Sequence, residues 1–204
     1  MPRSDWIDRQ LRSRGIDDER VLEAMRRVPR ELFVPAAVRR RAYADEALPL
    51  GAGQTVSQPY VVAFICQGLA LDGHERVLDV GTGSGYQAAV LAELAGEVHS
   101  IERIPELAEG ARAALTAAGY ARVDVHEGDG SLGLPEHAPY DAIAVAAATM
   151  GVPPELWAEL REGGRMVVPV GGSDVQELAV LERTQEGVRV VEAVWARFVP
   201  LLAG

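Results

Sequence analysis

Three glycines follow a short apolar run in the segment VLDVGTGSG at residues 77–85, and this segment is the one best suited to binding a ligand. The apolar run predicts a β-strand, and the residues after Gly85 have the spacing of a helix. A strand, a glycine turn and a helix start form the setting in which nucleotide ligands are bound. Glycine permits the tight turn and the close approach of a ligand to the backbone. We therefore expect Gly81, Gly83 and Gly85 to contact a ligand beyond the carboxyl end of this strand.

Asp79 and the spacing of the glycines distinguish between two classes of cofactor. The dinucleotide fingerprint G-x-G-x-x-G fails when counted from Gly81, because its sixth position is Tyr86. The variant G-x-G-x-x-A fits only when counted from Gly83, three residues after the strand ends at Val80. A carboxylate at Asp79 would repel a pyrophosphate but would accept a hydrogen bond from an ammonium group. S-adenosyl-L-methionine carries an ammonium group and no phosphate, so the pattern favours it over NAD.

Two more acidic residues follow later strands. Glu102 ends the second predicted strand, where a carboxylate can accept hydrogen bonds from both ribose hydroxyls. NAD enzymes use the same arrangement, so Glu102 indicates a ribose and not a particular cofactor. Asp129 and Gly130 follow the third strand, in a position to contact the adenine amino group, although an Asp between glycines is equally typical of a turn.

The predicted elements around these residues alternate between strands and helices. The strands are expected at residues 77–80, 98–101, 123–125, 140–145 and 165–170. The helices between them are expected at residues 85–95, 105–118 and 153–160. Residues 176–182 and 188–198 have the pattern of a hairpin turning at Glu186-Gly187. The alternation predicts an α/β fold, a Rossmann-like, doubly wound and mostly parallel sheet with a C-terminal antiparallel hairpin.

The residues before this sheet predict a helical cap. We expect a single domain in which residues 1–58 form an N-terminal helical cap and active-site loop, and residues 59–204 the cofactor-binding core. A helix should begin at residues 16–18, before apolar positions at helical spacing. Residues 42–58 show neither helix nor strand periodicity and should form a loop. A further helix should begin near Pro59, with Ser57 as a possible cap, and run to about Leu71.

Together these residues resemble the protein-L-isoaspartate O-methyltransferase family over nearly the whole chain. The glycine loop is shared by many methyltransferases, whereas GQTVSQP and RFVPL are specific to this family. The matching stretches are RVLEAM (20–25), VPRELFVP (28–35), GQTVSQP (53–59), GTGSGYQAA (81–89), SIER (100–103), GDG (128–130), VPVG (168–171) and RFVPL (197–201). The chain departs from the family at residues 146–148, which are Ala-Ala-Ala where the bacterial pattern often has Thr-Ala-Ala.

The resemblance implies a class I S-adenosylmethionine-dependent methyltransferase fold and isoaspartyl proteins and peptides as substrates. It implies that Ser57 is the catalytic position, that Thr55 and Val56 lie beside it against the cofactor, and that Gln176 is a further cofactor contact. The isoaspartyl α-carboxyl group should have a pKa of about 3.3–3.7 and be ionised at neutral pH. No general base is then needed, and Ser57 would position the carboxylate. In this family the methyl ester leads to a succinimide and back to aspartate.

No metal is expected, because the four histidines show no metal-ligand spacing along the chain and each should lie at the surface or in a loop. The formal net charge of −10 argues against a nucleic-acid partner.

No window of the sequence approaches the roughly 18 apolar residues of a membrane span. The N-terminus does not have the pattern of a secretory signal. The one cysteine, Cys66, lies in an apolar run and should be buried. The single cysteine favours a cytoplasmic location, and we also expect a monomer.

Three alternatives remain open from the sequence. The first is a methyltransferase of the same fold that acts on a small molecule, and the GQTVSQP sequence within residues 42–59 counts against it because it resembles the isoaspartyl family. An NAD-dependent oxidoreductase would use the glycine count from Gly83, but Asp79 and the absence of a hydride-transfer constellation count against it. A non-catalytic binding module would keep the ligand site without needing Ser57.

Overall fold

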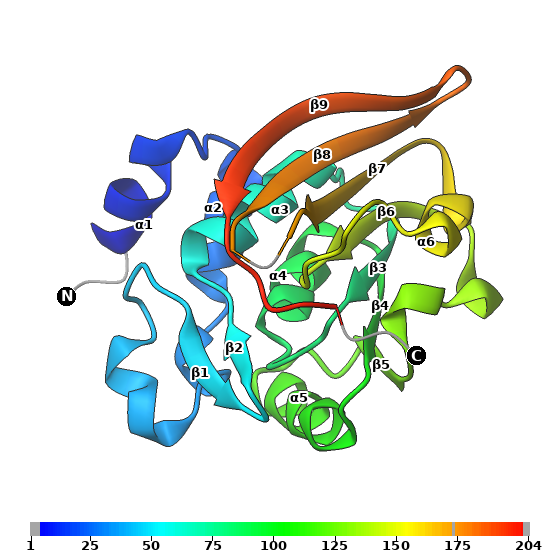
Figure 1. Ribbon diagram of the computed structural model, residues 1–204. Coiled ribbons are helices and arrows are strands. Elements are labelled where there is room, and N and C mark those ends of the chain that lie inside the picture. Colours follow the sequence, from blue (N-terminus) through cyan, green and yellow to red (C-terminus); the bar gives the residue numbers. More distant parts are fainter. Residues whose placement is uncertain (1–4, 173, 202–204) are drawn as a thin grey trace.

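The computed structural model describes residues 5–172 and 174–201, and its centre is a twisted sheet with the strand order β5-β4-β3-β6-β7-β8-β9 (Figure 1). The strands β3 to β7 are parallel, and β8 and β9 add to one edge as an antiparallel hairpin. The mostly parallel sheet with a C-terminal hairpin is therefore confirmed. The strands are β3 (Arg76–Val80), β4 (Glu97–Glu102), β5 (Asp124–Glu127), β6 (Tyr140–Val145), β7 (Leu160–Val170), β8 (Gln176–Thr184) and β9 (Gly187–Ala196).

The strand order reverses at β3, which pairs with β4 on one side and β6 on the other. The loops that follow β3 and β6 therefore diverge, and this is where a doubly wound sheet opens a crevice for a ligand. The glycine loop identified in the sequence is the connection that leaves β3 at this point.

Helices cover the two faces of the sheet unequally. The larger apolar cluster packs residues of α2 (Glu19–Arg27), α3 (Pro59–Leu69), α4 (Tyr86–Leu94) and α5 (Pro105–Ala117) against one face. The smaller cluster, on the other face, includes Leu156 of α6 (Pro154–Glu159) and Tyr140. Cys66 is buried in α3 as expected, and burial raises the pKa of its thiol. No helix in the described part of the chain has the length and apolarity needed to cross a membrane.

The N-terminal residues form α1 (Asp5–Gln10), α2 and short 3₁₀ turns, as the prediction of a helical cap requires. The start of α2 is fixed by Asp18, whose carboxylate accepts hydrogen bonds from the backbone nitrogens of Arg20 at 2.8 Å and Val21 at 3.4 Å. The division of the chain at residue 58 stays a prediction.

The prediction of a loop at residues 42–58 is wrong in part, because this segment contains a small antiparallel hairpin. Its strands are β1 (Leu48–Gly51) and β2 (Gln54–Val56), and Leu48 lies opposite Val56. Both of these side chains are buried, which explains why the pair forms. Each strand is too short to show an alternating pattern, and Pro49 and the glycines of the turn obscure it further.

Several boundaries also differ from the prediction. The helix α3 has Gln58 at its N-cap position and no side-chain cap, so the expected capping by Ser57 is wrong. This helix ends at Leu69 and not near Leu71. The strand β5 begins one residue later than expected, at Asp124. The strand β7 begins at Leu160 rather than Arg165, directly after α6 ends at Glu159.

Candidate active site

A cleft lies at the carboxyl ends of β3 and β4, where the strand order reverses. It encloses about 790 Å³ when the space open to solvent is included. The hairpin β1–β2 and the C-terminal segment 199–201 complete its walls. The structure brings together here seven residues singled out in the sequence: Thr55, Val56, Ser57, Gly81, Gly83, Glu102 and Gly130. Four others do not line it: Asp79, Gly85, Asp129 and Gln176.

The glycine loop is tied to the end of β4 by its own backbone. The nitrogens of Gly81 and Thr82 both donate to the carbonyl of Ile101, at 2.9 and 3.2 Å. Gly85, just before α4, has a φ of +84°, and an added Cβ would lie 3.1 Å from the Leu115 side chain. A larger residue at Gly85 would therefore be strained and crowded, so this glycine shapes the loop although it does not line the cleft.

Glu102 presents a fixed carboxylate to the cleft. Its Oε2 accepts a hydrogen bond from the nitrogen of Gly83 at 2.8 Å, and its Oε1 accepts one from the nitrogen of Ile104 at 3.0 Å. Each carboxylate oxygen can accept about two hydrogen bonds, so both oxygens keep capacity for ligand hydroxyls. This geometry fits the ribose contact expected from the sequence.

Asp79 lies behind the cleft wall and not in it. Its Oδ1 accepts a hydrogen bond from Gln87 Nε2 at 2.7 Å, and its Oδ2 accepts one from Ser100 Oγ at 2.8 Å. The Ser100 hydroxyl is in turn 2.6 Å from that of Thr82. Complete burial raises the pKa of Asp79 to about 6, against the opposing effect of these hydrogen bonds. The carboxylate therefore orients Gln87 and Thr82, which both line the cleft, and its direct contact with a ligand stays a prediction.

Gln87 is a cleft residue that the sequence reasoning missed. Among the described residues its Oε1 has no hydrogen-bond partner, although the atom is buried. A buried acceptor without a partner costs free energy unless a ligand supplies a donor, and an ammonium or amino group would do so. The sequence offered one indication of this role: Gln87 is the one amide side chain among the described buried residues of α4, and its buried neighbours on that helix are Tyr, Ala, Val and Leu.

Ser57 lies in the cleft wall between β2 and α3. Its carbonyl accepts a hydrogen bond from Arg30 Nη2 at 2.8 Å, and Arg30 Nε donates to the carbonyl of Ala42 at 2.7 Å. The Arg30 guanidinium is fully buried, 4.6 Å from the centroid of the Tyr86 ring, and burial lowers its pKa. The bond to Ser57 uses the carbonyl, so it fixes the backbone there without using the hydroxyl.

Asp129 and Gln176 do not line the cleft, and both have structural partners. Asp129 caps a 3₁₀ turn, η4 (Gly130–Leu132), by accepting hydrogen bonds from the nitrogen and hydroxyl of Ser131 at 3.0 and 2.7 Å. It also pairs with Arg103, at 3.3 Å. The Gln176 amide accepts a hydrogen bond from the nitrogen of Phe198 at 2.8 Å, which holds the C-terminal segment. Their roles as cofactor contacts stay predictions.

The C-terminal segment forms a wall of the cleft that the sequence did not assign to the site. The nitrogen of Ala148 donates to the carbonyl of Val199, and the nitrogen of Leu201 donates to the carbonyl of Ala148, both at 2.8 Å. This pairing places Val199 and Leu201 beside Ala146 and Ala147 in the cleft. In Figure 1 the red segment after β9 returns to the sheet near β6.

A second cavity, here called the neighbouring pocket, lies on the other side of Ser57. It shares Thr55, Ser57, Ala146 and Val199 with the cleft. Its remaining lining includes two arginines, Arg14 and Arg197, and three aromatic residues, Tyr60, Trp195 and Phe198. Arg14 stacks on Tyr60, with the guanidinium 3.5 Å from the ring centroid, and pairs with Asp45 at 2.8 Å. Positive charge and exposed aromatic surface fit an anionic group carried on a peptide.

The chain is similar in sequence to one family over nearly its full length. The model of the family described as Protein-L-isoaspartate(D-aspartate) O-methyltransferase (PCMT) matches residues 3–204. A protein-L-isoaspartate O-methyltransferase 1 of Syntrophobacter fumaroxidans is 52% identical over 98% of this chain and 94% of that protein. A protein-L-isoaspartate O-methyltransferase of Anaeromyxobacter dehalogenans is 55% identical over 97% of this chain and 94% of that protein.

Solved structures give the same likeness in three dimensions. A structure named protein-L-isoaspartate O-methyltransferase matches with a TM-score of 0.85 at 29% identity, over 99% of this chain and 66% of that chain. A candidate protein-L-isoaspartate O-methyltransferase of Plasmodium falciparum, in complex with S-adenosyl-L-homocysteine, matches with a TM-score of 0.83 at 22% identity, over 99% of both chains. The second likeness shows the shared fold.

Proposed function

The chain belongs to the protein-L-isoaspartate(D-aspartate) O-methyltransferase family, and we propose that its reaction takes place where the cleft meets the neighbouring pocket. The reaction transfers a methyl group from S-adenosyl-L-methionine to the free α-carboxyl group of L-isoaspartyl residues in damaged proteins and peptides. One observation carries the proposal: Thr55 and Ser57 line both cavities. A methyl donor in the cleft and a carboxylate in the neighbouring pocket would meet at these residues.

The cleft residues fit S-adenosyl-L-methionine, which supplies an electrophilic methyl group on a sulfonium sulfur. Glu102 would accept hydrogen bonds from the ribose hydroxyls, with both carboxylate oxygens held by backbone nitrogens. The buried Oε1 of Gln87 would accept one from the ammonium group. Asp79 would favour the same cation from behind Gln87, because the two side chains are hydrogen-bonded at 2.7 Å. Ile101, near the end of β4, and Gly130, in the turn after β5, would pack against the adenosyl part.

The neighbouring pocket fits the acceptor. An α-carboxyl group of the main chain has a pKa of about 3.3–3.7, so it enters as a carboxylate and needs no general base. Arg197 is exposed at this pocket and would attract the carboxylate. Ser57 would donate a hydrogen bond that turns one carboxylate oxygen toward the methyl group. Rate enhancement would come mainly from this orientation, which can replace several kcal/mol of activation free energy with binding.

The extra methylene of an isoaspartyl residue explains how the site could select it. In an isoaspartyl residue the main chain runs through the side-chain carbonyl, and the α-carboxyl group is left free on a short branch. A pocket that holds the peptide on both sides of this branch would bring only that carboxyl group to Ser57. Esterification gives this carboxyl group methoxide as a leaving group, which a free carboxylate lacks. The neighbouring backbone nitrogen then attacks the ester carbonyl carbon, methanol leaves and a succinimide forms, whose hydrolysis returns part of the material to aspartate.

The rest of the assignment concerns partners and location. We propose that the protein acts as a monomer in the cytoplasm, with isoaspartyl proteins and peptides as its partners and neither nucleic acid nor membrane among them. The formal net charge of −10 supports the exclusion of nucleic acid and membranes as partners, because phosphate backbones and anionic lipid surfaces would both repel the chain.

The direct test is methyl transfer from isotopically labelled S-adenosyl-L-methionine to a synthetic isoaspartyl peptide. The product should be an ester, which releases labelled methanol in alkali, and incubation at neutral pH should then yield aspartyl peptide. A label that resists alkali would show transfer to nitrogen or carbon and would reject the proposed acceptor. Absence of transfer to the peptide, with transfer to a small carboxylic acid, would favour a small-molecule methyltransferase instead.

A further inference from the structure

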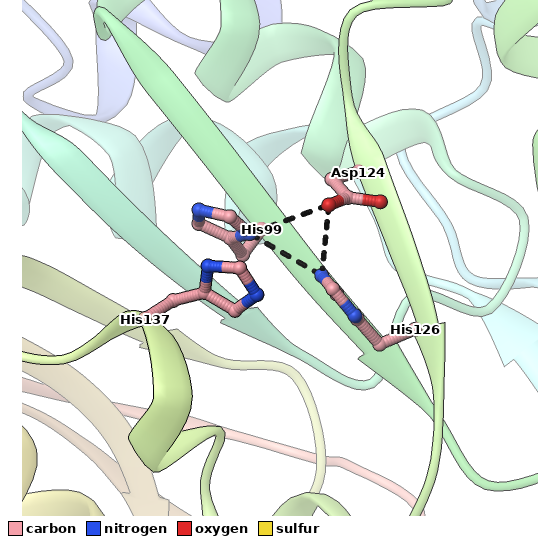
Figure 2. Close-up of side chains that lie close together, drawn as sticks. All are labelled: His99, Asp124, His126 and His137. Carbon is pink, nitrogen blue, oxygen red and sulfur yellow. Dashed lines mark hydrogen bonds and ion pairs between the residues drawn. The ribbon is translucent and has the colours of Figure 1, made fainter.

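Three of the four histidines meet on one face of the sheet, together with Asp124 (Figure 2). His99 comes from β4, Asp124 and His126 come from β5, and His137 comes from the 3₁₀ turn η5 (Pro135–His137). Each offers a ligand atom, and these atoms all lie within 4.8 Å of one another. The expectation that every histidine lies at the surface or in a loop is therefore wrong for His99, which is 4% exposed in a strand. Sequence spacing could not reveal the cluster, because the sheet register creates it.

The distances within the cluster match those between ligands of one metal ion. His99 Nδ1 is 3.2 Å from His126 Nε2, and His126 Nε2 is 3.2 Å from Asp124 Oδ2. The remaining pair, His99 Nδ1 and Asp124 Oδ2, is 3.8 Å apart. Two ligands bound at 2.0–2.1 Å around a tetrahedral zinc ion lie about 3.3 Å from each other. A small inward movement of Asp124 would give all three atoms that spacing.

The orientation of His99 is also that of a metal ligand. Its Nε2 is 2.9 Å from Glu97 Oε1, a carboxylate oxygen that can only accept, so Nε2 carries the hydrogen. The lone pair of Nδ1 is then directed at His126 and Asp124. Glu97 is itself held by Arg76, at 2.7 Å. Histidines that bind metals commonly donate their second N–H to a carboxylate in this way, which fixes the ring and raises its basicity.

His137 approaches the other three from outside the sheet. Its ring is stacked on that of His99, with the centroids 4.1 Å apart, and lies 5.2 Å from that of His126. Figure 2 shows it coming from the turn and lying beside the His99 ring. One of its ring nitrogens lies within 4.8 Å of the ligand atoms of the other three residues, so it is the candidate for the fourth ligand.

We propose that His99, Asp124, His126 and His137 form a binding site for a zinc ion, separate from the methyl-transfer site. Imidazole nitrogens with one carboxylate oxygen, and no thiolate, are ligands that zinc accepts in tetrahedral geometry. None of these four described residues lines the cleft, so the ion has no part in the methyl transfer. Its role is structural, because it joins η5 to β4 and β5.

Without the metal, the proton on His126 Nε2 would occupy the same centre, shared between His99 Nδ1 and Asp124 Oδ2. A divalent cation that displaces this proton satisfies all three acceptors at once. The formal net charge of −10 favours its approach. The proton-bridged cluster and the zinc-bound cluster can be told apart by measurement, because only the zinc site requires that the isolated protein take up zinc.

The test is calorimetric titration of untagged full-length protein with zinc chloride, after removal of metals by dialysis against a chelator. We expect one zinc ion per chain with micromolar or tighter affinity, and a higher Tm in the presence of zinc. His126→Ala and Asp124→Asn should each weaken binding by at least roughly 10–100-fold and abolish the zinc-dependent rise in Tm. His74→Ala, at an exposed histidine outside the cluster, is the matched control and should bind as the parent does.

Cobalt provides a second measurement that does not depend on variants. Cobalt bound in the proposed geometry should give the intense visible absorption of a four-coordinate ion, and zinc should displace it. The proposal is overturned if the parent protein binds no zinc at micromolar concentration. It is equally overturned if correctly folded His126→Ala binds zinc as the parent does, or if His74→Ala loses binding to the same extent as His126→Ala.

Discussion

The buried guanidinium of Arg30 donates a hydrogen bond to the main-chain carbonyl of Ser57, with Nη2 2.8 Å from the oxygen. The same guanidinium holds the carbonyl of Ala42 and stacks on Tyr86, the first residue of α4. One side chain from the helical cap thus ties together both ends of the segment 42–57 and the helix that follows the glycine loop. The position of Ser57 relative to the cofactor cleft depends on this contact.

Replacing Arg30 tests that dependence. Arg30→Lys keeps the positive charge, but a lysine ammonium lacks the planar guanidinium that donates to the carbonyls of both Ala42 and Ser57. We expect kcat to fall by roughly 10-fold or more while the affinity for S-adenosyl-L-homocysteine changes little, because the cleft residues themselves are intact. Steady-state kinetics and calorimetry measure the two effects. Arg40→Lys, at an exposed site, is the matched control. If cofactor affinity falls as much as kcat, Arg30 supports the whole fold and not Ser57 in particular.

Ser57→Ala separates a catalytic role from a structural one. The structure gives Ser57 no capping bond in α3, so the melting temperature should change little. A hydrogen bond to a charged group contributes about 1.5–3 kcal/mol, so kcat and kcat/KM should fall together by roughly 10–100-fold. Some activity should remain, because Ser57 is not a nucleophile here. A variant with a lower Tm and normal single-turnover rate would show instead that Ser57 is structural.

Glu102→Gln examines the ribose contact. The amide keeps the shape of the side chain but replaces one acceptor oxygen with a donor, which opposes either the Gly83 or the Ile104 nitrogen. Binding of S-adenosyl-L-homocysteine should weaken by about 1.5–3 kcal/mol, measured by calorimetry. Glu106→Gln, on the exposed face of α5, serves as the control. Unchanged affinity in Glu102→Gln would remove this residue from the cofactor site.

The raised pKa of Asp79 gives the cofactor affinity a pH dependence. Burial raises this pKa to about 6, and a ligand with a positive charge binds the ionised form better. Affinity for S-adenosyl-L-methionine should therefore fall as the pH drops through about 6, and the slope should be lost in Asp79→Asn. Calorimetry between mildly acidic and neutral pH measures both. An identical slope in the variant would assign the titration to another group.

The same group affects folding with the opposite sign. A carboxyl group whose pKa is raised in the folded state contributes stability that is present below its ordinary pKa of 3.8 and lost as the pH rises through about 6. The shift corresponds to a cost on the order of 3 kcal/mol at neutral pH. The protein retains Asp79 at this cost, which is consistent with a role in binding a cation.

The sequence predicted those features that depend on local pattern. The strands and helices around the glycine loop, and the hairpin at 176–198, follow from periodicity and from glycine and proline positions. Glu102, Gly81 and Gly83, which line the cleft, could be singled out because each lies at a fixed distance from a strand end, whereas Gly85 does not line it. The hairpin β1–β2 was missed because its strands are too short to show alternation.

Features that depend on tertiary packing could not be predicted. Gln87 became a candidate only when its carbonyl oxygen was found buried without a partner among the described residues. Arg30 belongs to a stretch typical of the family, but its contact with Ser57 joins residues 27 positions apart in the chain. The histidine cluster likewise depends on the register that sets His99 beside Asp124. Asp79 was placed at the correct strand end, but its complete burial was not foreseen.

The measurement that tests the central claim most directly compares two peptides of one sequence, one with an L-isoaspartyl and one with an L-aspartyl residue at the same position. The ratio of their kcat/KM values for methyl transfer measures selection of the displaced α-carboxyl group. We predict a ratio of at least about 100 in favour of the isoaspartyl peptide, because a site that fixes the peptide on both sides rejects a carboxylate one bond out of place. Equal methylation of the two peptides would contradict the account, even if the cofactor is bound as described.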